Sequence, residues 1–282
     1  MNPERLRQRA AITRALHEWF HSNGYLEVHT PVLVRSPAME EHLEAVSCGD
    51  RFLHTSPEFG MKKVLGSGLC RIYQIGPCFR SEEVGLHHTE EFTMAEWYRV
   101  GAGTQELMND TEDIIGVAAA AVGVEPPSFS RVSVQELRQR VGLADTVEEV
   151  EWFRQWVDQV EPRLTEPTIV YNYPIWQAAL AQQCNGFADR FEVYLSGIEI
   201  GNCFAEEMDS GTLRTRFERS AARRSEMGRV PHRIDTDLLE CTPRMPRTAG
   251  IAVGVDRLVM ALTGAHDIRD VQARYSPERR RQ

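Results

Sequence analysis

Residues 79–99 read Phe-Arg-Ser-Glu-Glu-Val-Gly-Leu-His-His-Thr-Glu-Glu-Phe-Thr-Met-Ala-Glu-Trp-Tyr-Arg. The second half of this stretch combines aromatic residues and threonine, a composition typical of a β-strand. The polar loop between Glu83 and Glu90 lets that strand turn back on the strand that ends at Ser81. The stretch therefore predicts a long antiparallel hairpin.

The hairpin gathers polar chemistry on one side. Alternation places Phe92, Met94, Glu96 and Tyr98 on one face of the second strand. Arg80 and Glu82 share a face of the partner strand, and the connecting loop adds His87 and His88. An arginine suits an α-phosphate because its guanidinium makes two charge-assisted hydrogen bonds. A surface lattice of ion pairs would explain the same charges without any ligand.

The predicted last strand, from Gly250 to Val255, has one nearly bare face. Gly250, Ala252 and Gly254 lie on it, whereas the alternate residues are apolar and face the core. A flat ligand could lie against the bare face. Arg257 follows at the start of the next helix, where the helix dipole disfavours a cation that lacks an anionic or aromatic partner. We therefore expect Arg257 to face a ligand.

Two glutamates form a candidate metal site. Glu192 and Glu199 flank a possible turn at residues 194–197, so a hairpin would bring both carboxylates together on adjacent strands. Paired carboxylates repel each other unless a cation lies between them. Mg²⁺ that bridges phosphates would fit, and a nearby lysine or arginine is the alternative.

The rest of the chain gathers helices around strand pairs. Helices are predicted at residues 4–20, 56–65, 210–227 and 256–262, and strands near 25–28, 71–75, 79–81, 168–171, 190–195 and 198–204. Residues 104–160 are predicted to be helical, with a break at Glu125-Pro126-Pro127. Helices and strands do not alternate regularly, so we predict the α+β class, with an antiparallel sheet flanked by helices.

The composition indicates a globular protein. Of 282 residues, 42% are hydrophobic, which suffices for a packed core. No apolar run approaches the roughly 20 residues of a membrane span, and no signal segment is visible, so a cytoplasmic protein is expected. The net charge of −9 argues against an extensive basic surface for nucleic acid. The six cysteines contain no CxxC pair, so neither a zinc site nor a disulfide framework is expected.

Several of these segments resemble the signature motifs of class II aminoacyl-tRNA synthetases. Residues 79–83 and 91–98, with the loop that carries His88, are similar to motif 2. Residues 250–257 are similar to motif 3, and the opening helix and strand with Pro31 are similar to motif 1. Three further blocks, at residues 56–62, 191–192 and 199–206, are similar to lysyl-tRNA synthetases. The resemblance implies a single class II catalytic domain over residues 1–282, with a helical insertion at about 104–165.

The resemblance also implies a role for each matching residue. ATP would be bound by Arg80, Ser81, Glu82, His88, Thr89, Phe92, Glu199, Ile200, Gly254 and Arg257, with Arg80 and Arg257 as the catalytic residues. The amino acid would be surrounded by Ser56, Pro57, Glu58, Glu96, Tyr98, Asn202, Glu206 and Ala252. Glu192 and Glu199 would hold Mg²⁺. An acid-rich pocket suits a substrate with two ammonium groups, and which carboxylate takes which ammonium stays open.

The expected acceptor is a protein. Lysyl-tRNA synthetases carry an anticodon-binding domain ahead of motif 1, whereas here the motif 1 helix begins within the first residues, so we expect no such domain and little action on tRNA. A free-standing catalytic core resembles the elongation factor P lysyltransferases, which attach (R)-β-lysine to a lysine of elongation factor P. Ala252 stands where lysyl-tRNA synthetases usually have glycine, while Thr89 and Cys203 depart from the common pattern.

The reaction implied by this resemblance is ATP-dependent activation of (R)-β-lysine or lysine as its adenylate, followed by transfer to a lysine of elongation factor P. Motif 1 would form a homodimer. Two alternatives remain, namely a ligase that acts on tRNA or another acceptor, and a noncatalytic paralogue that binds nucleotide. The presence of Arg80, Glu199 and Arg257 weighs against the noncatalytic alternative.

Overall fold

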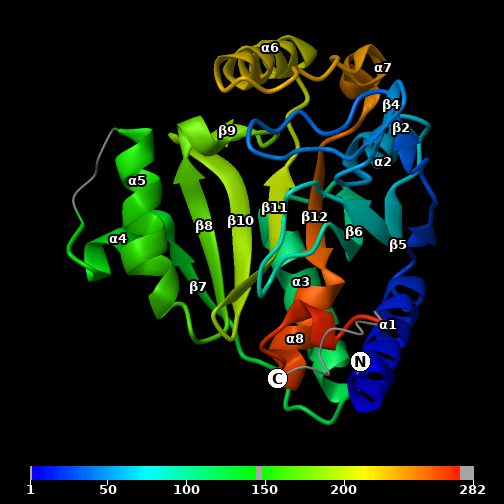
Figure 1. Ribbon diagram of the computed structural model, residues 1–282, viewed down its shortest axis with the longest axis vertical. Coiled ribbons are helices and arrows are strands. Elements are labelled where there is room, and N and C mark those ends of the chain that lie inside the picture. The colour runs from blue at the N-terminus through cyan, green and yellow to red at the C-terminus, as the bar shows by residue number, and fades with distance from the viewer. Residues whose placement is uncertain (1, 144–147, 274–282) are drawn as a thin grey trace, which may run out of the picture.

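The protein is described here by a computed structural model that covers residues 2–143 and 148–273. Its centre is a sheet with the strand order β1-β5-β6-β12-β11-β10-β8-β7 (Figure 1). These strands are β1 (Leu26–Glu27), β5 (Arg71–Phe79), β6 (Glu91–Val100), β7 (Ser130–Ser133), β8 (Thr168–Pro174), β10 (Phe187–Leu195), β11 (Ile198–Ala205) and β12 (Thr248–Gly254), and β9 (Gln183–Cys184) pairs with β10. Among the strand pairs of this sheet in the described residues, only the edge pairs β1–β5 and β7–β8 are parallel. The predicted α+β class with an antiparallel sheet is confirmed.

The predicted hairpin is formed by β5 and β6. Its register runs from Arg71 opposite Arg99 to Phe79 opposite Glu91. The prediction of separate strands at residues 71–75 and 79–81 was wrong, because β5 continues through Pro77 and ends at Phe79. Proline is tolerated there since β1 covers only the start of the outer edge of β5, so no ladder bond on that edge needs the missing N–H.

One face of the sheet is covered by α1 (Pro3–Ser22), α3 (Thr104–Ala120) and α8 (Val255–Thr263). Ala95 and Trp97 of β6 and Ile251 and Val253 of β12 face these helices in the main core, each at most 3% exposed. Period-2 alternation turns their neighbours, Glu96, Tyr98 and Ala252 among them, toward the opposite face. The strand faces predicted for residues 91–98 and 250–255 are therefore those of the structure.

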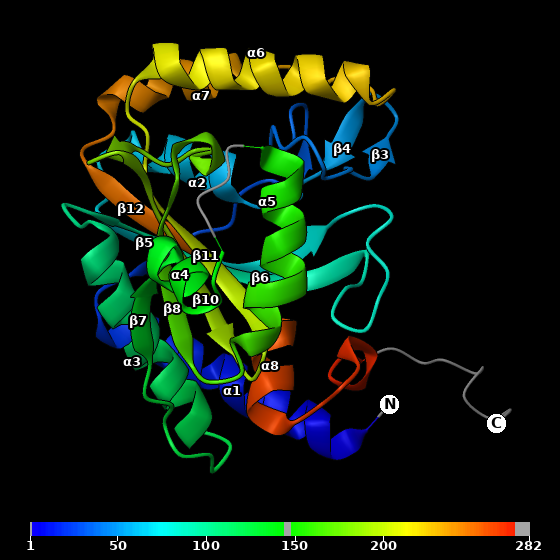
Figure 2. The same ribbon diagram turned by 90° about the vertical axis from the view of Figure 1, so that its left-hand side faces the viewer.

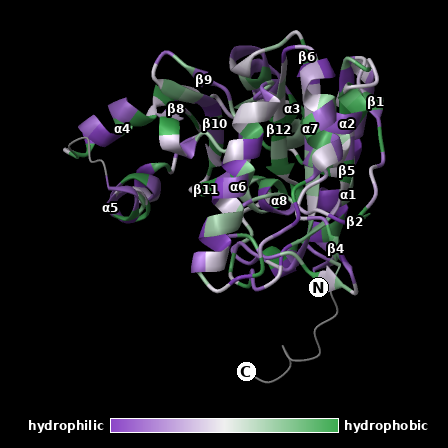
Figure 3. Cartoon of the chain, turned by 90° about the horizontal axis from the view of Figure 1, so that it is seen from above, coloured by the Kyte–Doolittle hydropathy of each residue, from purple (hydrophilic) through white to green (hydrophobic). Residues whose placement is uncertain are grey.

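Residues 104–165 divide into two parts. The helix α3 packs into the main core, while β7 joins the sheet beside β8, so the prediction of helices on both sides of the break at Glu125-Pro126-Pro127 missed the strand at Ser130–Ser133. Beyond β7, α4 (Val134–Arg140) and α5 (Glu149–Gln155) share a second core with β8 and β10, in which Trp152 and Trp156 stack with ring centroids 5.1 Å apart. Seen from above, α4 and α5 lie to one side of the sheet (Figure 3).

The top of the molecule is formed by α2 (Glu58–Leu65), α6 (Ser210–Glu226) and α7 (Thr236–Cys241), with α6 running across it (Figure 2). A second sheet, which the sequence did not predict, has β4 (Arg51–Leu53) between β2 (Leu33–Val34) and β3 (Ser47–Cys48). The described residues also contain short helical turns. A single turn of π-helix lies at Trp156–Val160, and single 3₁₀ turns lie at Glu161–Arg163, Ile175–Gln177, Thr242–Arg244 and Ile268–Asp270. Within residues 2–143 and 148–273, no helix is long and apolar enough to cross a bilayer.

Candidate active site

A cavity of about 940 Å³ lies on the face of the sheet that α1, α3 and α8 leave free. Its floor is formed by β6, β10, β11 and β12, and the loop between β5 and β6 closes one end. The upper walls come from α6 and from the loop at residues 39–42, and Glu149 and Phe153 of α5 complete the rim. Elements from distant parts of the chain therefore converge on one concave site.

Most of the residues singled out in the sequence meet in this cavity. Its lining includes Ser56, Glu58, Arg80, His88, Thr89, Phe92, Glu192, Glu199, Ile200, Asn202, Ala252, Gly254 and Arg257. Glu96, Tyr98 and Glu206 lie beneath it, each at most 2% exposed. Pro57, Ser81 and Glu82 are not part of the lining.

Glu82 corrects one expectation about the hairpin. Because β5 ends at Phe79 and Glu82 adopts a left-handed backbone with φ +67°, Glu82 does not share a strand face with Arg80 and is exposed. Ser81 instead donates its backbone N–H to the carbonyl of Glu44. The binding of ATP by Glu82 stays a prediction.

Two arginines approach the cavity from the segments that resemble motifs 2 and 3. The guanidinium of Arg80 lies over the ring of Phe92, 5.1 Å from its centroid. Arg257 donates to the backbone carbonyls of Glu199, at 2.9 Å, and His87, at 3.2 Å. Its Nη2 is 2.5 Å from Nε2 of His88, and burial together with the Arg257 charge lowers the pKa of His88. His88 is therefore a neutral acceptor that helps to orient Arg257.

The two candidate metal ligands have different surroundings. A bulge at Val193/Tyr194 places Tyr194 opposite Glu199 and Asn202 opposite Glu192, so the glutamates are diagonal neighbours on one face rather than a direct pair. The carboxylate of Glu192 accepts hydrogen bonds from the hydroxyls of Tyr173 and Tyr194 and, at 2.5 Å, from Arg190. Arg190 thus pairs with Glu192, and the binding of a metal by the two glutamates stays a prediction.

Glu199 is less strongly paired than Glu192. Its side chain is 35% exposed to the cavity, and the nearest guanidinium, that of Arg257, is 3.7 Å away. Burial and the neighbouring charge of Glu192 raise the pKa of Glu199 to about 7. A further cation at this carboxylate would favour its ionised form. No three histidine, cysteine, aspartate or glutamate side chains of the described chain form a ready-made metal cluster.

Three carboxyl groups lie together at the bottom of the cavity, and we call this cluster of Glu58, Glu96 and Glu206 the acidic floor. Glu96 accepts hydrogen bonds of 2.7 Å from the hydroxyls of both Ser56 and Tyr98. Glu58 and Glu206 are joined through Lys62, whose Nζ is 2.5 Å from a carboxylate oxygen of each. Above this floor, the buried Oδ1 of Asn202 has no hydrogen-bond partner, so it is available to a ligand donor.

The acidic floor predicts a pH dependence of substrate affinity. Burial and the charge of Glu58 raise the pKa of Glu96 and of Glu206 to about 8. Below that pH the coupled carboxyls retain a proton that an incoming ammonium must displace. We expect the affinity for a ligand that carries ammonium groups to rise between pH 6.5 and 8 by up to about tenfold per unit. Binding of a diamino acid measured across this pH range tests it, and a flat profile would contradict it.

Three residues in or beneath the cavity were not singled out in the sequence. Glu40 enters the cavity from an irregular loop, and its side chain is exposed to solvent. Arg190 is buried between the rings of Tyr173 and Phe204. Lys62 could have been found, because it follows Glu58 by four residues on one helix and therefore shares its face.

Known proteins resemble this chain over nearly its whole length. Residues 2–274 match the family of tRNA synthetases class II (D, K and N). The chain is 38% identical to the elongation factor P--(R)-beta-lysine ligase of Vibrio vulnificus, with 96% of this chain and 95% of that protein covered. It is 36% identical to the ligase of the same name from Erwinia tasmaniensis, over 95% and 94% of the two chains.

Proposed function

Since this chain belongs to the class II tRNA synthetase family (D, K and N), together with the elongation factor P--(R)-beta-lysine ligases, we propose that it is an ATP-dependent ligase of that kind. It activates (R)-β-lysine, or lysine, as the aminoacyl-adenylate. It then transfers the aminoacyl group to a lysine of elongation factor P.

One observation carries this proposal: a single cavity joins a cationic end to an acidic floor. Arg80 and Arg257 offer guanidinium groups to phosphate oxygens at one end. Glu58, Glu96 and Glu206 offer carboxylates to ammonium groups at the other. A triphosphate and a diammonium amino acid bound in this way would meet between the two ends.

The proposed chemistry has two displacement steps. In the first, an oxygen of the substrate carboxylate attacks the α-phosphorus, the bond to the β-phosphate oxygen breaks, and pyrophosphate leaves. In the second, the amine of the acceptor lysine attacks the acyl carbon, AMP leaves, and the amine loses a proton. Neither step needs a nucleophilic side chain of the enzyme. Cys203 lies in the main core at 0% exposure, so it does not narrow the pocket.

The proposed role of the arginines is electrostatic. Negative charge builds up on the phosphate oxygens as the α-phosphorus is attacked, and fixed guanidinium groups stabilise that charge. Arg257 is held for this role by the carbonyls of Glu199 and His87 and by His88. Arg80 is steadied by the ring of Phe92.

Mg²⁺ fits the carboxylate pair of Glu192 and Glu199 in part. Mg²⁺ takes few protein ligands when it binds phosphates, and Glu199 presents a carboxylate to the cavity beside a second one. Glu192 would have to exchange one of its three hydrogen bonds for the ion. When bound, the ion would neutralise phosphate charge.

Replacing Glu199 should raise the magnesium requirement. Glu199→Gln removes the freer anionic ligand, so half-maximal activity is expected at a higher Mg²⁺ concentration, by about tenfold. Glu192→Gln should have a smaller effect, because that carboxylate is already paired with Arg190. Titration of Mg²⁺ at fixed ATP measures both variants. An unchanged requirement in Glu199→Gln would return this residue to a structural role.

Ala252 is placed to influence the choice between β-lysine and lysine. In the register of the sheet it lies opposite both Glu96 of β6 and Asn202 of β11. Ala252→Gly opens methyl-sized space between these two groups, so preference should shift from (R)-β-lysine toward lysine by roughly tenfold. Adenylate formation with each amino acid at limiting concentration gives the ratio. If the ratio does not move, Ala252 does not set the choice.

The acceptor is tested directly by mass spectrometry of elongation factor P. Purified enzyme, ATP, Mg²⁺ and (R)-β-lysine should add one lysyl mass to it, and an acceptor whose target lysine is arginine should stay unchanged. Purified tRNA serves as the competing acceptor in a parallel reaction. Efficient lysylation of tRNA with none of elongation factor P would overturn this assignment.

We also propose a homodimer in the cytoplasm, where a translation factor would be met. A groove of about 660 Å³ follows the outer side of α1, between Leu6 and His21, and offers a surface for a second copy. Light scattering of the purified protein measures the mass in solution.

A further inference from the structure

Lys62 has no part in the reaction described above, yet it lies at the centre of the acidic floor. It projects from α2 and is 5% exposed. Its ammonium lies 2.5 Å from Glu58, one helical turn earlier, and 2.5 Å from Glu206, which follows the end of β11. Burial alone would lower the pKa of Lys62, but Glu206 and Glu58 more than offset this and raise it. Lys62 is therefore a permanent cation.

The floor has an imbalance of charge. Three buried carboxyls, Glu58, Glu96 and Glu206, share it with the single ammonium of Lys62. Two further ionisable groups beside them are neutral, because burial raises the pKa of the Tyr98 phenol and of the Cys78 thiol. Glu40 and Arg80, of opposite charge, lie above the floor in the open cavity. With all three carboxyls ionised, two negative charges remain unmatched.

We propose that Lys62 is a built-in counter-ion that fixes Glu58 and Glu206 and sets the pocket to accept two positive charges, one for each ammonium of the substrate. This inference rests on the proposed function and adds a specificity determinant to it. Without Lys62 three carboxylates would face two ammonium groups. With a second cation a substrate with one ammonium would suffice.

The first test removes the charge of Lys62 while keeping a similar volume. An opposite charge within about 4–6 Å lowers a carboxyl pKa by about 1–3 units, so Lys62→Met should shift the pH profile of kcat/KM for (R)-β-lysine upward by that amount. Because the carboxyls of Lys62→Met would then be more fully protonated at pH 7, the KM for the amino acid should rise about tenfold or more at that pH. The KM for ATP should stay unchanged.

The neighbouring lysine provides a matched control. Lys63 lies on the same helix and pairs with Asp235 at 2.6 Å, away from the acidic floor. Lys63→Met removes an equal charge and side chain, and it should leave both the KM for the amino acid and the pH profile as they are. Equal changes in the two variants would show that Lys62 acts only through the stability of α2.

The second test does not depend on the folding of Lys62→Met alone, because the double variant also removes the Glu206 carboxylate that would otherwise be left buried without its counter-ion. Glu206→Gln alone leaves two carboxylates against Lys62, so the floor keeps one unmatched negative charge and affinity for (R)-β-lysine falls. Adding Lys62→Met to Glu206→Gln restores two unmatched charges at a pH that ionises both Glu58 and Glu96. At pH 9, above the pKa of about 8 of Glu96, the double variant should therefore bind at least about tenfold more tightly than Glu206→Gln, although it has lost one more native contact.

Amino-acid-dependent ATP–pyrophosphate exchange reads out all of these variants. A double variant that is no better than Glu206→Gln overturns the charge balance, since a purely structural role for Lys62 makes the losses add. Failure of the proposed function is a separate result, because the unsubstituted enzyme would then show no exchange with lysine or (R)-β-lysine.

Discussion

Alanine in place of Arg257 is expected to lower amino-acid-dependent ATP–pyrophosphate exchange by about 100- to 1,000-fold, the usual cost of losing one preorganised donor to a developing anion. The structure holds this guanidinium at the mouth of the cavity through two backbone carbonyls and His88. These partners survive the substitution, so the loss would come from the missing cation. Arg80→Ala should show a loss of similar size.

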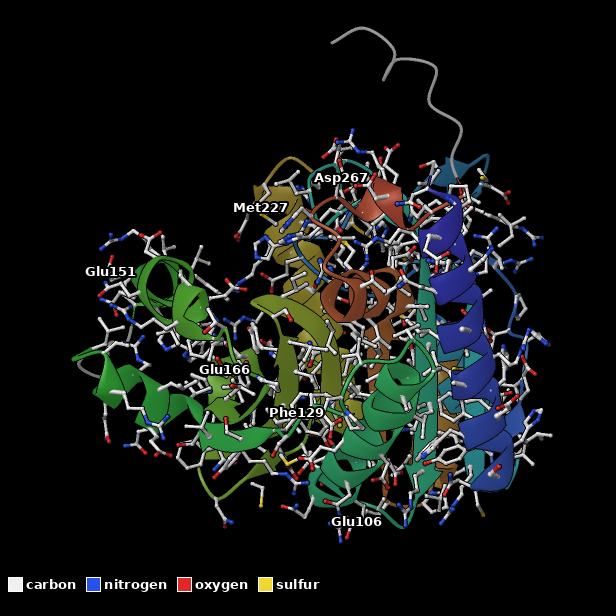
Figure 4. All side chains as sticks on the ribbon, turned by 90° about the horizontal axis from the view of Figure 1, so that it is seen from below. Glu106, Phe129, Glu151, Glu166, Met227 and Asp267 are labelled. Carbon is white, nitrogen blue, oxygen red and sulfur yellow. The ribbon has the colours of Figure 1, made fainter. Side chains whose placement is uncertain are left out.

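A suitable control for both variants is Arg154→Ala. Arg154 pairs with Glu151 on the outer side of α5, where Figure 4 labels Glu151, and its side chain is 61% exposed. That substitution should leave exchange within about twofold, because an exposed ion pair contributes little to stability. Exchange that survives in both Arg80→Ala and Arg257→Ala would refute the assignment of these residues as catalytic.

Alanine in place of Gly250 is expected to destabilise the whole domain by about 3 kcal/mol, at the upper end of the range for overpacking. An added Cβ would lie 2.2 Å from Cε1 of Tyr98 and 2.3 Å from Cδ1. The backbone of β12 cannot move away, because it is hydrogen-bonded between β6 and β11. The ring of Tyr98 cannot move away either, because its hydroxyl donates a hydrogen bond to Glu96. The midpoint of urea unfolding measures the loss.

Gly76→Ala is the matched control for this prediction. Gly76 lies in β5 of the same sheet, and the nearest atom to its added Cβ is Nε2 of Gln74 at 3.6 Å, an ordinary contact. Its unfolding midpoint should stay close to that of the parent protein. An equally small change in Gly250→Ala would mean that the ring of Tyr98 can move, and the packing argument would fail.

Gly250 also shows where sequence reasoning stopped short. Alternation along residues 250–255 correctly assigned the apolar residues to the core, because the period of two is a local property of any strand. It could not reveal what fills the space beside a glycine. The ring of Tyr98 occupies the space beside Gly250, whereas Ala252 and Gly254 do line the cavity.

Other misses share a physical cause, which is that the deciding contacts lie far apart in the chain. The strands β2, β3 and β7 have two to four residues, too few to display a period, and only their partners make them strands. The bulge at Val193/Tyr194 shifts the register by a residue that no hydrophobic pattern marks. The pairing of Lys62 with Glu206 joins two such distant segments.

The pairing of β6 with β12 also constrains the order of events during synthesis. Val100 pairs with Thr248, so β6 leaves the ribosome long before its partner has been translated. At about 5–20 residues per second the delay is on the order of ten seconds. Until then the edge of β6 that β12 will occupy presents unpaired backbone groups, a template for aggregation that a chaperone would have to cover. Because Arg257 follows directly after β12, the proposed nucleotide site can be completed only after this wait, and nucleotide binding would not stabilise the nascent chain before then.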